Sequence, residues 1–376
     1  MDRIAFLTKR DILYSGGGGD LYVHELAKRL ASEYDVSVIA TRIGGGPITE
    51  YVDNIRVTRI GSLEAISRLR VPLYLIRHLK EIDVIIENVT VIPWMTPLFT
   101  SKPRVAIVHQ LLREIFFHEL PRVVAWPAYA IEPLLYKPYK NVPIVCPAGE
   151  TTIKSLTNVG LRSENIIPIS CGVSQKYLDI GREALTRKSE SPTILVMTRL
   201  EAYKRVDWAL YAMKRVLRSC PTAHMIIVGD GRQLNRLKVL TSQLNMSANV
   251  TFRGFVSEEE KMRLLAEAHV HIWSLGYRDG CGLSILEANA FWTPSIAWNA
   301  IGPSDTILDG ETGILVPYGD ICRLSESLLS ILTNSEFRLR LAMNAYRLAC
   351  RHSWDLAASQ FSSIIEGLLA RGKSDS

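Results

Sequence analysis

The sequence predicts an α/β protein with two doubly wound domains, each built on a parallel sheet. Its 376 residues exceed the usual length of one domain, and 47% of them are hydrophobic, enough for two cores. Short runs rich in Val and Ile recur between longer amphipathic stretches. These runs are apolar at consecutive positions, as in strands that helices cover on both faces. Strand and helix in regular alternation indicate parallel sheets.

The expected strands form two series, separated by a polar segment. The first series comprises Arg3–Leu7, Val36–Ala40, Val84–Glu87, Val105–His109, Ile144–Pro147 and Ile166–Ser170. The second comprises Ile194–Thr198, Met225–Gly229, Val250–Phe255, Val270–Trp273, Ser295–Trp298 and Gly313–Val316. Helical spacing of apolar residues appears between strands, as at Val23, Leu26, Ala27 and Leu30 and at Val206, Leu210, Met213 and Leu217.

The polar segment Tyr177–Pro192 holds no apolar run and ends in proline, which is typical of a linker. We therefore predict an N-terminal domain over residues 1–178 and a C-terminal domain over residues 179–352.

Composition excludes several classes of protein. The net charge of +6, from 44 Lys and Arg against 38 Asp and Glu, is too small and too evenly spread to indicate nucleic-acid binding. Six scattered cysteines without a Cys-x-x-Cys pattern are expected to be reduced thiols in the core of a cytoplasmic protein, with no metal site. The apolar run at the start is too short for a signal peptide, and no stretch is long enough to span a membrane.

Two glycine-rich turns each follow an expected strand and precede a helix. In the first, Gly16–Gly19, the backbone and the helix N-terminus would favour an anion, with Gly17 and Gly18 closest to it; the alternative is a flexible turn with Asp20 capping the helix. The second, around Gly229 and Gly231, is weak evidence alone because any α/β domain turns there on a small residue.

Two cations follow the strand Ile194–Thr198. Arg199 and Lys204 lie in the loop before the next helix, and ligands of open α/β sheets bind at the carboxyl ends of strands. Both could hold a diphosphate, unless they are only solvated surface charges.

The stretch Asp279–Ala290 carries the most information. Backbone amides of Gly282, Leu283 and Ser284 at a helix start would bind anionic oxygens, while Asp279 and Glu287 could accept hydrogen bonds from sugar hydroxyls. Glu287 lies among apolar residues, so that if it is buried it needs a specific partner.

The C-terminal half, roughly residues 193–320, resembles a glycosyltransferase of family 4, formerly group 1, with the GT-B fold. The resemblance rests on several motifs in the family's order: Arg199-Leu200 with Lys204, Gly229 and Gly231, Gly254-Phe255, Asp279 to Glu287 around Gly282-Leu283, Thr293-Pro294, and Gly302 with Gly313. The N-terminal half is similar more loosely, through its glycine run, His109 at a strand end and Gly172-Val173.

This resemblance implies two Rossmann-like domains facing a cleft and a last helix, about residues 353–370, that packs back on the first domain. It implies a retaining, metal-independent transfer from a nucleotide-sugar, without a cofactor, in glycolipid or polysaccharide biosynthesis. Arg199 and Lys204 would stabilise the leaving diphosphate, Glu287 would hold the ribose, Asp279 the donor sugar, and His109 would contact the sugar. Gly17, Gly18, Gly229, Gly254, Phe255, Gly282, Leu283 and Ser284 would line the donor site.

Three residues depart from the family pattern. Asp279 replaces its first Glu, Cys281 its Phe and Trp292 the small residue before Thr-Pro, all at or near the expected donor pocket. These departures keep open a catalytically impaired nucleotide-sugar-binding protein. A sugar-nucleotide epimerase or phosphorylase of the same fold is a further alternative.

The segment Ile115–Lys140 mixes aromatic residues with cations, as an interfacial segment does. Its aromatic residues are Phe116, Phe117, Trp126, Tyr129, Tyr136 and Tyr139, its cations include Arg122, Lys137 and Lys140, and Arg68, Arg70, Arg77 and Lys80 could add positive charge. It is either a surface for peripheral contact with the cytoplasmic membrane face, which favours a lipid-linked acceptor, or a helix packed on the sheet.

Overall fold

The computed structural model describes residues 1–376 apart from 11–16, 43–46, 62–63, 91, 274–275, 277–279, 281 and 375–376. Two compact units emerge. The first contains residues 1–113, 126–171 and 354–376, and the second contains residues 114–125 and 172–353. The division falls before Gly172 instead of after Leu178, and the second unit also takes the segment Glu114–Ala125.

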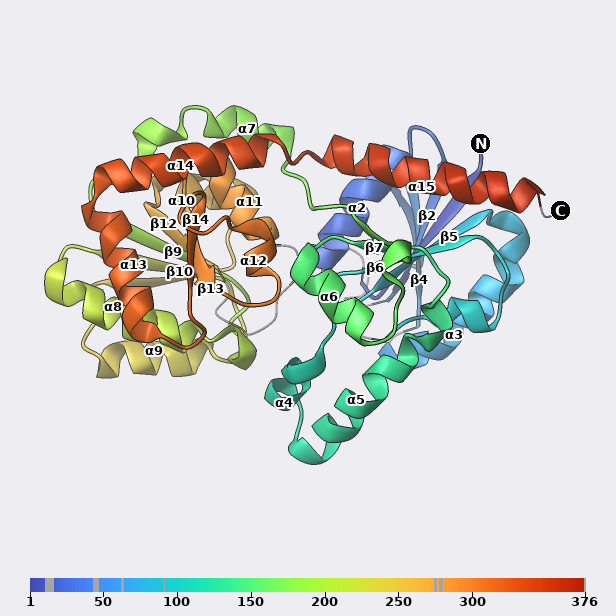
Figure 1. Ribbon diagram of the computed structural model, residues 1–376, viewed down its shortest axis with the longest axis horizontal. Helices are drawn as coiled ribbons and strands as arrows, with labels where there is room; N and C mark the ends of the chain where they lie inside the picture. Colours follow the sequence, from blue (N-terminus) through green and yellow to red (C-terminus); the bar gives the residue numbers. More distant parts are fainter. Residues whose placement is uncertain are drawn as a thin grey trace. The chain divides into compact units, whose positions relative to one another are not determined.

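The first unit is built on an eight-stranded sheet with the order β3-β4-β2-β1-β5-β6-β7-β8, parallel except for β3 (Figure 1). The strands are β1 (Arg3–Thr8), β2 (Asp35–Thr41), β3 (Thr49–Val52), β4 (Ile55–Ile60), β5 (Val84–Val89), β6 (Arg104–Val108), β7 (Ile144–Cys146) and β8 (Ile166–Pro168). The helices are α2 (Gly18–Leu30), α3 (Glu64–His78), α4 (Phe116–Glu119), α5 (Arg122–Leu135), α6 (Glu150–Asn158) and α15 (Trp354–Ser374), of which α4 and the first turn of α5 group with the second unit.

The expected strands of this half are all present, and strands β3 and β4 were not expected. They form an antiparallel hairpin that turns on Asp53 and Asn54, whose φ angles are +50° and +63°. Asp and Asn tolerate this left-handed conformation, and such two-residue turns match the twist of a hairpin.

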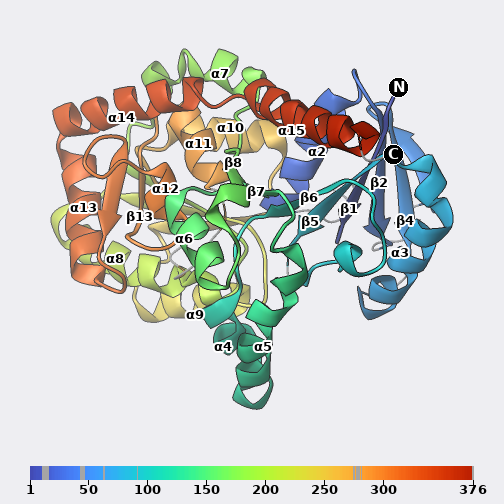
Figure 2. The same ribbon diagram turned by 45° about the vertical axis from the view of Figure 1, so that its right-hand side comes forward.

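Helix α15 belongs to the first unit, although it is last in the chain, and lies along α2 in both ribbon views (Figures 1 and 2). The Trp354 ring meets the edge of Tyr22 at 5.6 Å, and Phe361 stacks on Phe6 of β1 at 6.4 Å. Arg29 of α2 also pairs with Asp355 at 2.5 Å. The apolar face of α15 therefore completes the core over β1.

The second unit contains a parallel sheet with the order β11-β10-β9-β12-β13-β14. Its strands are β9 (Thr193–Met197), β10 (His224–Val228), β11 (Val250–Gly254), β12 (Val270–Ile272), β13 (Ser295–Trp298) and β14 (Gly313–Val316). Its helices are α7 (Gln175–Gly181), α8 (Val206–Ser219), α9 (Leu234–Gln243), α10 (Glu258–Glu267), α11 (Leu283–Ala290), α12 (Pro303–Thr306), α13 (Ile321–Thr333) and α14 (Ser335–Cys350). Both sheets confirm the doubly wound α/β class.

The segment expected to be a linker is packed into the second unit, so that prediction is wrong for most of its length. It forms α7 and a 3-10 turn over Ala184–Arg187, and the Tyr177 ring lies 5.5 Å from the ring of Phe291, the C-cap of α11. The Lys188 ammonium donates three hydrogen bonds, to the carbonyl oxygens of Ala268 and Phe291 and to the Thr293 hydroxyl. A segment with the polar composition of a linker can therefore pack against a domain when a few of its polar side chains find specific hydrogen-bond partners there.

Each sheet reverses its strand order at one place. In the first sheet β1 lies between β2 and β5, and in the second β9 lies between β10 and β12. Loops at the carboxyl ends of such neighbouring strands diverge and leave a crevice in which open α/β sheets bind ligands. Ligands are therefore expected at the loops after β1, β5, β9 and β12.

The cysteines are not all reduced. Cys220 is free and buried, as expected. Cys322 and Cys350 are free but exposed, so they are not the core thiols that were expected. Cys171 is disulfide-bonded, which corrects the expectation for that residue.

Candidate functional site

The loop after β9 brings two cations to one aromatic ring. Arg199 donates a hydrogen bond to the Tyr203 hydroxyl at 2.9 Å, and the Lys204 ammonium lies 4.9 Å from the centre of the same ring. Lys204 is 8% exposed, whereas Arg199 is exposed. Tyr203 therefore holds both positive charges beside the place where the strand order of the second sheet reverses, which we call its switch point.

The turn after β10 packs its backbone directly on that loop. Leu200 donates its amide to the carbonyl of Asp230 at 2.9 Å, and Gln233 donates its amide to the carbonyl of Leu200 at 2.9 Å. Gly229 and Gly231 have φ angles of +126° and +156°, and a Cβ on Gly229 would lie 2.0 Å from the Thr198 carbonyl oxygen. These two glycines thus position the loop of Arg199 and Lys204.

The neighbouring strand β11 ends in an unusual exposed aromatic residue. Gly254 has a φ of +67° and accepts a hydrogen bond from the Gly229 amide at 2.8 Å. Phe255, which follows it, is 92% exposed. A phenyl ring left in solvent at the ligand-binding edge of a sheet can stack on a planar group.

Helix α11 begins at the same edge with Gly282 as its N-cap. Gly282 has a φ of +66°, and a Cβ there would lie 2.7 Å from the Thr306 hydroxyl oxygen, so this position requires glycine. The amides of Leu283 and Ser284 are in the first turn of the helix, where backbone donors have no intrahelical acceptor. The helix start can therefore bind anionic oxygens.

Glu287 lies one turn further along α11 and is 7% exposed. Its Oε1 atom accepts a hydrogen bond of 2.7 Å from the ammonium of Lys261, which belongs to α10. Burial raises the pKa of Glu287, and the charge and hydrogen bond of Lys261 oppose that shift. The carboxylate thus has the specific partner that its burial demands.

Asp279 and Cys281 lie outside the described residues. Among the residues that the structure describes, no group of three or more His, Cys, Asp or Glu side chains could hold a metal ion.

Trp292 follows the end of α11 that is opposite to Gly282. Its indole donates a hydrogen bond to the Gly181 carbonyl at 3.0 Å and stacks on Tyr346 of α14 at 4.3 Å, with 10° between the rings. The large side chain at this position therefore joins α7, α11 and α14 and is explained by packing.

In the first unit a chain of hydrogen bonds leads to His109. The His109 ring nitrogen Nε2 lies 2.9 Å from Asn88 Oδ1, and the Asn88 amide donates to the Thr8 hydroxyl at 3.1 Å. Since Asn88 donates through its nitrogen, its oxygen faces His109, so that Nε2 carries the proton and Nδ1 is the acceptor. Burial lowers the pKa of His109 to about 4 and keeps the ring neutral near pH 7.

Asp20 continues this chain to the glycine-rich turn. Thr8 donates its hydroxyl to Asp20 at 3.2 Å, and the Gly17 amide donates to the other Asp20 oxygen at 3.0 Å. Asp20 therefore caps the first turn of α2, as the alternative interpretation held. Through Thr8, Asp20 also connects the start of α2 to the carboxyl ends of β1 and β5.

Gly17 and Gly18 are exposed, and a Cβ on either would meet nothing within 4 Å. Internal packing therefore does not require glycine at these two positions. A Cβ on Gly19, in contrast, would lie 3.1 Å from the His109 ring. Gly17 is the N-cap of α2, and Gly18 is its first residue.

Sequence reasoning missed Asn88, Tyr203 and Lys261. Asn88 follows Glu87 in an otherwise apolar strand, a visible signal of buried polar partners. Lys261 follows three glutamates at the start of α10 and looks like a surface charge, so that only the fold reveals its contact with Glu287.

The loop that follows His109 is held by helix α5. The buried carboxylate of Glu132 accepts hydrogen bonds from the amides of Leu112 at 2.6 Å and Arg113 at 2.9 Å. Arg113 in turn donates to the Tyr129 carbonyl at 3.0 Å and lies 3.6 Å over the Tyr129 ring. One face of α5 is therefore fastened to the chain three residues beyond His109.

Two family descriptions match this chain, one in each half. Residues 16–176 match the family described as Glycosyltransferase Family 4, and residues 179–348 match Glycosyl transferases group 1. A relative from Mycobacterium tuberculosis (strain CDC 1551 / Oshkosh), a GDP-mannose-dependent alpha-(1-6)-phosphatidylinositol monomannoside mannosyltransferase, is 27% identical over 48% of this chain and 49% of its own length. The aligned part thus spans about half the length of this curated relative.

Solved structures show the same fold. The chain superimposes on sucrose-phosphate synthase from Thermosynechococcus elongatus with a TM-score of 0.82 and 20% identity, covering 99% of this chain and 100% of that one. The Anabaena protein Alr3699/HepE, solved in complex with UDP and glucose, gives a TM-score of 0.75 and 16% identity, with 98% and 100% covered. Both structures are GT-B glycosyltransferases, which confirms the fold implied by the sequence motifs.

Proposed function

Since this chain belongs to the group 1 and family 4 glycosyltransferases, we propose that it transfers a sugar from a nucleotide-sugar to an acceptor, with retention of configuration and without a metal ion. The observation that carries the proposal is the switch point of the second sheet. Loop cations, two glycine turns, a helix start and a buried carboxylate converge there on one ligand-binding edge.

Arg199, Lys204 and the helix start would assist departure of the donor diphosphate. In the transfer the acceptor hydroxyl oxygen forms a bond to the sugar C1 and gives its proton to the departing phosphate oxygen. The bond between C1 and that phosphate oxygen breaks, and its electron pair leaves with the nucleoside diphosphate. Two fixed cations and the amides of Gly282, Leu283 and Ser284 would stabilise that growing charge. They supply by hydrogen bonding and charge what a divalent cation supplies in other transferases, which supports metal independence.

Other groups at this edge would hold the rest of the donor. Glu287 would accept hydrogen bonds from the ribose hydroxyls, and the exposed Phe255 ring would stack on the base. Gly229 and Gly254 would let the donor approach the backbone, and Asp279 would hold the donor sugar.

The first unit would supply His109 and the start of α2. The neutral His109 ring, fixed through Nε2, would accept a hydrogen bond from a sugar hydroxyl at Nδ1. Gly17 and Gly18 would let an anionic or hydroxyl group reach the helix start.

Ligand binding and product analysis test this proposal. Thermal unfolding with UDP, GDP or ADP should show stabilisation by one of them, because a ligand at about one hundred times its Kd adds roughly 2.7 kcal/mol to the stability of the folded state. The matching nucleotide-sugar should then yield a product with the donor's anomeric configuration, at the same rate with and without EDTA. Loss of activity in EDTA that Mg²⁺ restores would contradict metal independence, and an altered free sugar without a new glycosidic bond would indicate an epimerase.

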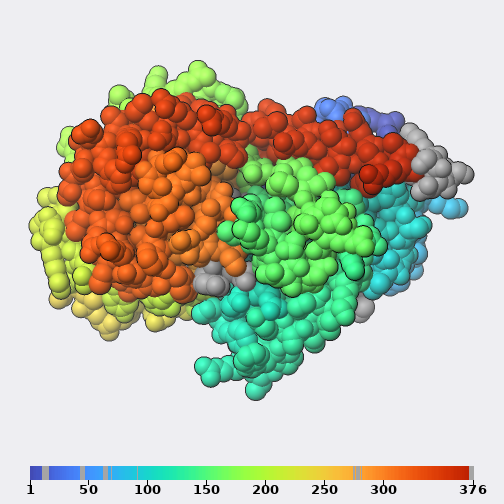
Figure 3. Space-filling model, viewed as in Figure 1, coloured from blue at the N-terminus to red at the C-terminus, as the bar shows by residue number. Residues whose placement is uncertain are grey.

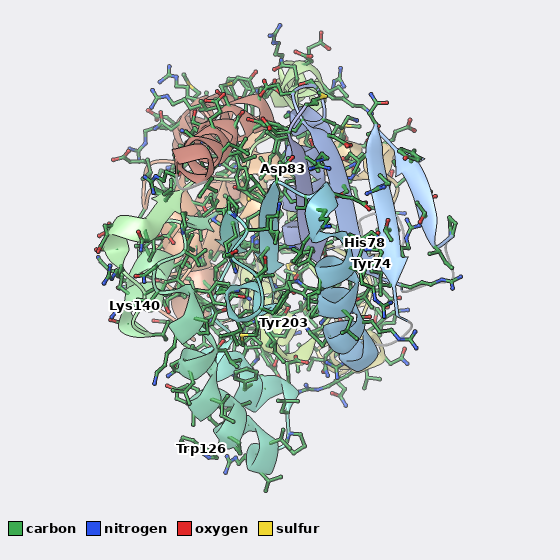
Figure 4. The ribbon with its side chains drawn as sticks, turned by 90° about the vertical axis from the view of Figure 1, so that its right-hand side faces the viewer. Tyr74, His78, Asp83, Trp126, Lys140 and Tyr203 are labelled. Carbon is green, nitrogen blue, oxygen red and sulfur yellow. The ribbon has the colours of Figure 1, made fainter. Side chains whose placement is uncertain are left out.

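We further propose that the acceptor is lipid-linked and that α5 contacts the membrane that carries it. Five apolar side chains of α5 are exposed, by 49% to 83%: Val123, Val124, Trp126, Ile131 and Leu134. Figure 4 shows Trp126 at the end of α5 away from the sheet, and α5 stands at the surface in Figure 3. Tyr136 and Tyr139 are buried in the core, so these two residues do not belong to the contact surface.

Exposed cations in and after α5 fit a peripheral contact with a membrane surface. Arg122, Lys137 and Lys140 are exposed in and after α5, and cations beside apolar side chains favour anionic headgroups. Among the described residues no helix is both long and apolar enough to cross a membrane. The curated mycobacterial relative acts, by its name, on a phosphatidylinositol monomannoside.

Replacing Val123 and Trp126 together with serine should weaken binding to vesicles that contain anionic phosphatidylglycerol on the order of tenfold or more. Burying an aromatic or aliphatic side chain stabilises by about 1.5–3 kcal/mol, and 1.4 kcal/mol corresponds to tenfold. Flotation of the protein with these vesicles measures the effect. The matched control is Val239→Ser, at an apolar residue of α9 that is 56% exposed. Equal flotation with neutral vesicles, or no difference between the variants, would contradict the membrane contact.

A further inference from the structure

The carboxylate of Glu287 is one member of a cluster that joins three helices of the second unit. Lys261 of α10 lies 2.7 Å from Glu287 Oε1 and 3.8 Å from Glu258 Oε2. The Tyr177 hydroxyl of α7 donates a hydrogen bond to Glu258, and the Lys261 ammonium lies 5.3 Å from the centre of the Tyr177 ring. Lys261 is thus held by two carboxylates and an aromatic face.

This arrangement fixes the position of a long side chain that would otherwise be mobile. The Lys261 side chain is 23% exposed and that of Glu287 is 10% exposed, so solvent competes little with their contact. By comparison, the pair of Lys154 and Glu150 in α6 has the same 2.7 Å separation but is 71% and 77% exposed. Exposed pairs of that kind contribute little to stability or orientation, whereas a largely buried pair restrains both partners.

From this geometry we infer that Lys261 is a positioning residue for nucleotide binding, which orients the Glu287 carboxylate and keeps it ionised to receive the ribose of the donor. The inference rests on the proposed function, because it takes Glu287 as the group that holds the ribose. Lys261 engages Oε1, so that the ribose hydroxyls would be received by Oε2. Its own contact is with Glu287, not with the nucleotide.

Ionisation matters because the carboxylate accepts hydrogen bonds through both oxygens, whereas protonation places an O–H donor on one of them. With the Lys261 ammonium donating to Oε1, that proton would lie on Oε2, the oxygen proposed to face the ribose. Burial raises the pKa of Glu287, the nearby Glu258 raises it further, and Lys261 lowers it. Tyr177 faces both carboxylates from α7, where burial, Glu287 and Glu258 raise its own pKa, so it stays a neutral donor. Helix α14 also packs on α11, through Tyr346 against Trp292. Lys261 is therefore the cation in this cluster that favours the ionised form of Glu287.

Removal of Lys261 should shift the pH dependence of nucleotide binding. Without Lys261 the pKa of Glu287 rises further, so that the fraction ionised at a given pH falls. Binding of a nucleotide that needs the ionised form is then lost at a higher pH than in the unmodified protein. A role in packing alone would lower stability without moving this pH dependence.

Calorimetric titration with UDP and GDP between pH 5 and pH 8.5 tests the inference. In Lys261→Met, affinity for the nucleotide that the unmodified protein binds should fall on the order of tenfold at pH 7, and the acidic loss of binding should shift to higher pH. Lys261→Arg should restore both properties, because it keeps the charge. Lys261→Gln keeps a donor and similar size without the charge, so it should show the same pH shift even where Lys261→Met folds poorly. Lys154→Met, at the exposed pair, should behave as the unmodified protein.

Further variants separate the outcomes. Glu287→Gln should weaken binding and remove the pH dependence, and adding Lys261→Met to it should cause little further loss, since the two residues act as a unit. Unchanged affinity and pH dependence in Lys261→Met and Lys261→Gln would overturn the inference while nucleotide binding, and with it the proposed function, stands. A folded unmodified protein that binds none of the tested nucleotides or nucleotide-sugars would overturn both.

Discussion

Replacing Lys204 with alanine is expected to lower turnover on the order of 100-fold or more, and replacing Arg199 is expected to have the smaller of the two large effects. Lys204 is 8% exposed and Arg199 is exposed, so the charge of Lys204 acts across a less polar surrounding on the departing diphosphate. The measurement is kcat for transfer from the matching nucleotide-sugar at saturating donor.

The matched control for this pair is Arg236→Ala. Arg236 is an exposed cation of α9 that donates a hydrogen bond to the side-chain oxygen of Gln233, three residues away in the chain. It should keep the rate of the unmodified protein. Unmodified rates in folded Lys204→Ala and Arg199→Ala would contradict the assignment of the loop after β9 to diphosphate stabilisation.

Gly229→Ala is expected to destabilise the second unit on the order of 3 kcal/mol or more, with loss of activity. The new Cβ would lie 2.0 Å from the carbonyl oxygen of Thr198, a backbone atom that cannot move without displacing Arg199. The φ of +126° adds strain for any residue with a side chain. The midpoint of thermal unfolding measures the effect.

Gly310→Ala is the control that has the backbone strain of a positive φ without a steric clash of the new Cβ. Gly310 has a φ of +71°, but a Cβ there would meet nothing within 4 Å. It should therefore cost only the roughly 1–2 kcal/mol of a left-handed residue. Equal unfolding midpoints for the two variants would show that the contact between the β10 turn and the β9 loop has no special role.

Much of the fold could be predicted because strands covered by helices on both faces leave an unmistakable apolar pattern. The runs around Val84 and Val270 became β5 and β12 on that ground. The hairpin of β3 and β4 escaped for two reasons. Strand β3 is a partly exposed edge strand, and the buried strand β4 has Arg56, Thr58 and Arg59 among its apolar residues, so neither shows a continuous apolar run. The strongest signal of the hairpin was the turn at Asp53 and Asn54.

Site residues could be predicted where their role depends on local backbone conformation. They could not be predicted where it depends on contacts between residues far apart in the sequence. The glycine turn at Gly229 and the helix start at Gly282 are local features, visible in sequence. The contact of Lys261 with Glu287 joins residues 26 positions apart, and that of Asn88 with His109 joins residues 21 positions apart. The contacts of Trp292 with Gly181 and Tyr346 were likewise hidden, because an aromatic residue reveals its packing partners only in the folded chain.

The hydrogen bonds of Glu132 to the loop after His109 connect α5 to the neighbourhood of His109. The Glu132 carboxylate holds the amides of Leu112 and Arg113 from one face of α5, while the opposite, exposed face is the one proposed to meet a lipid surface. A surface that shifts α5 then also shifts the loop beside His109, so the two binding events share a free energy of coupling. By linkage, ligand bound next to His109 strengthens or weakens attachment to the surface by the same factor as the surface changes affinity for that ligand.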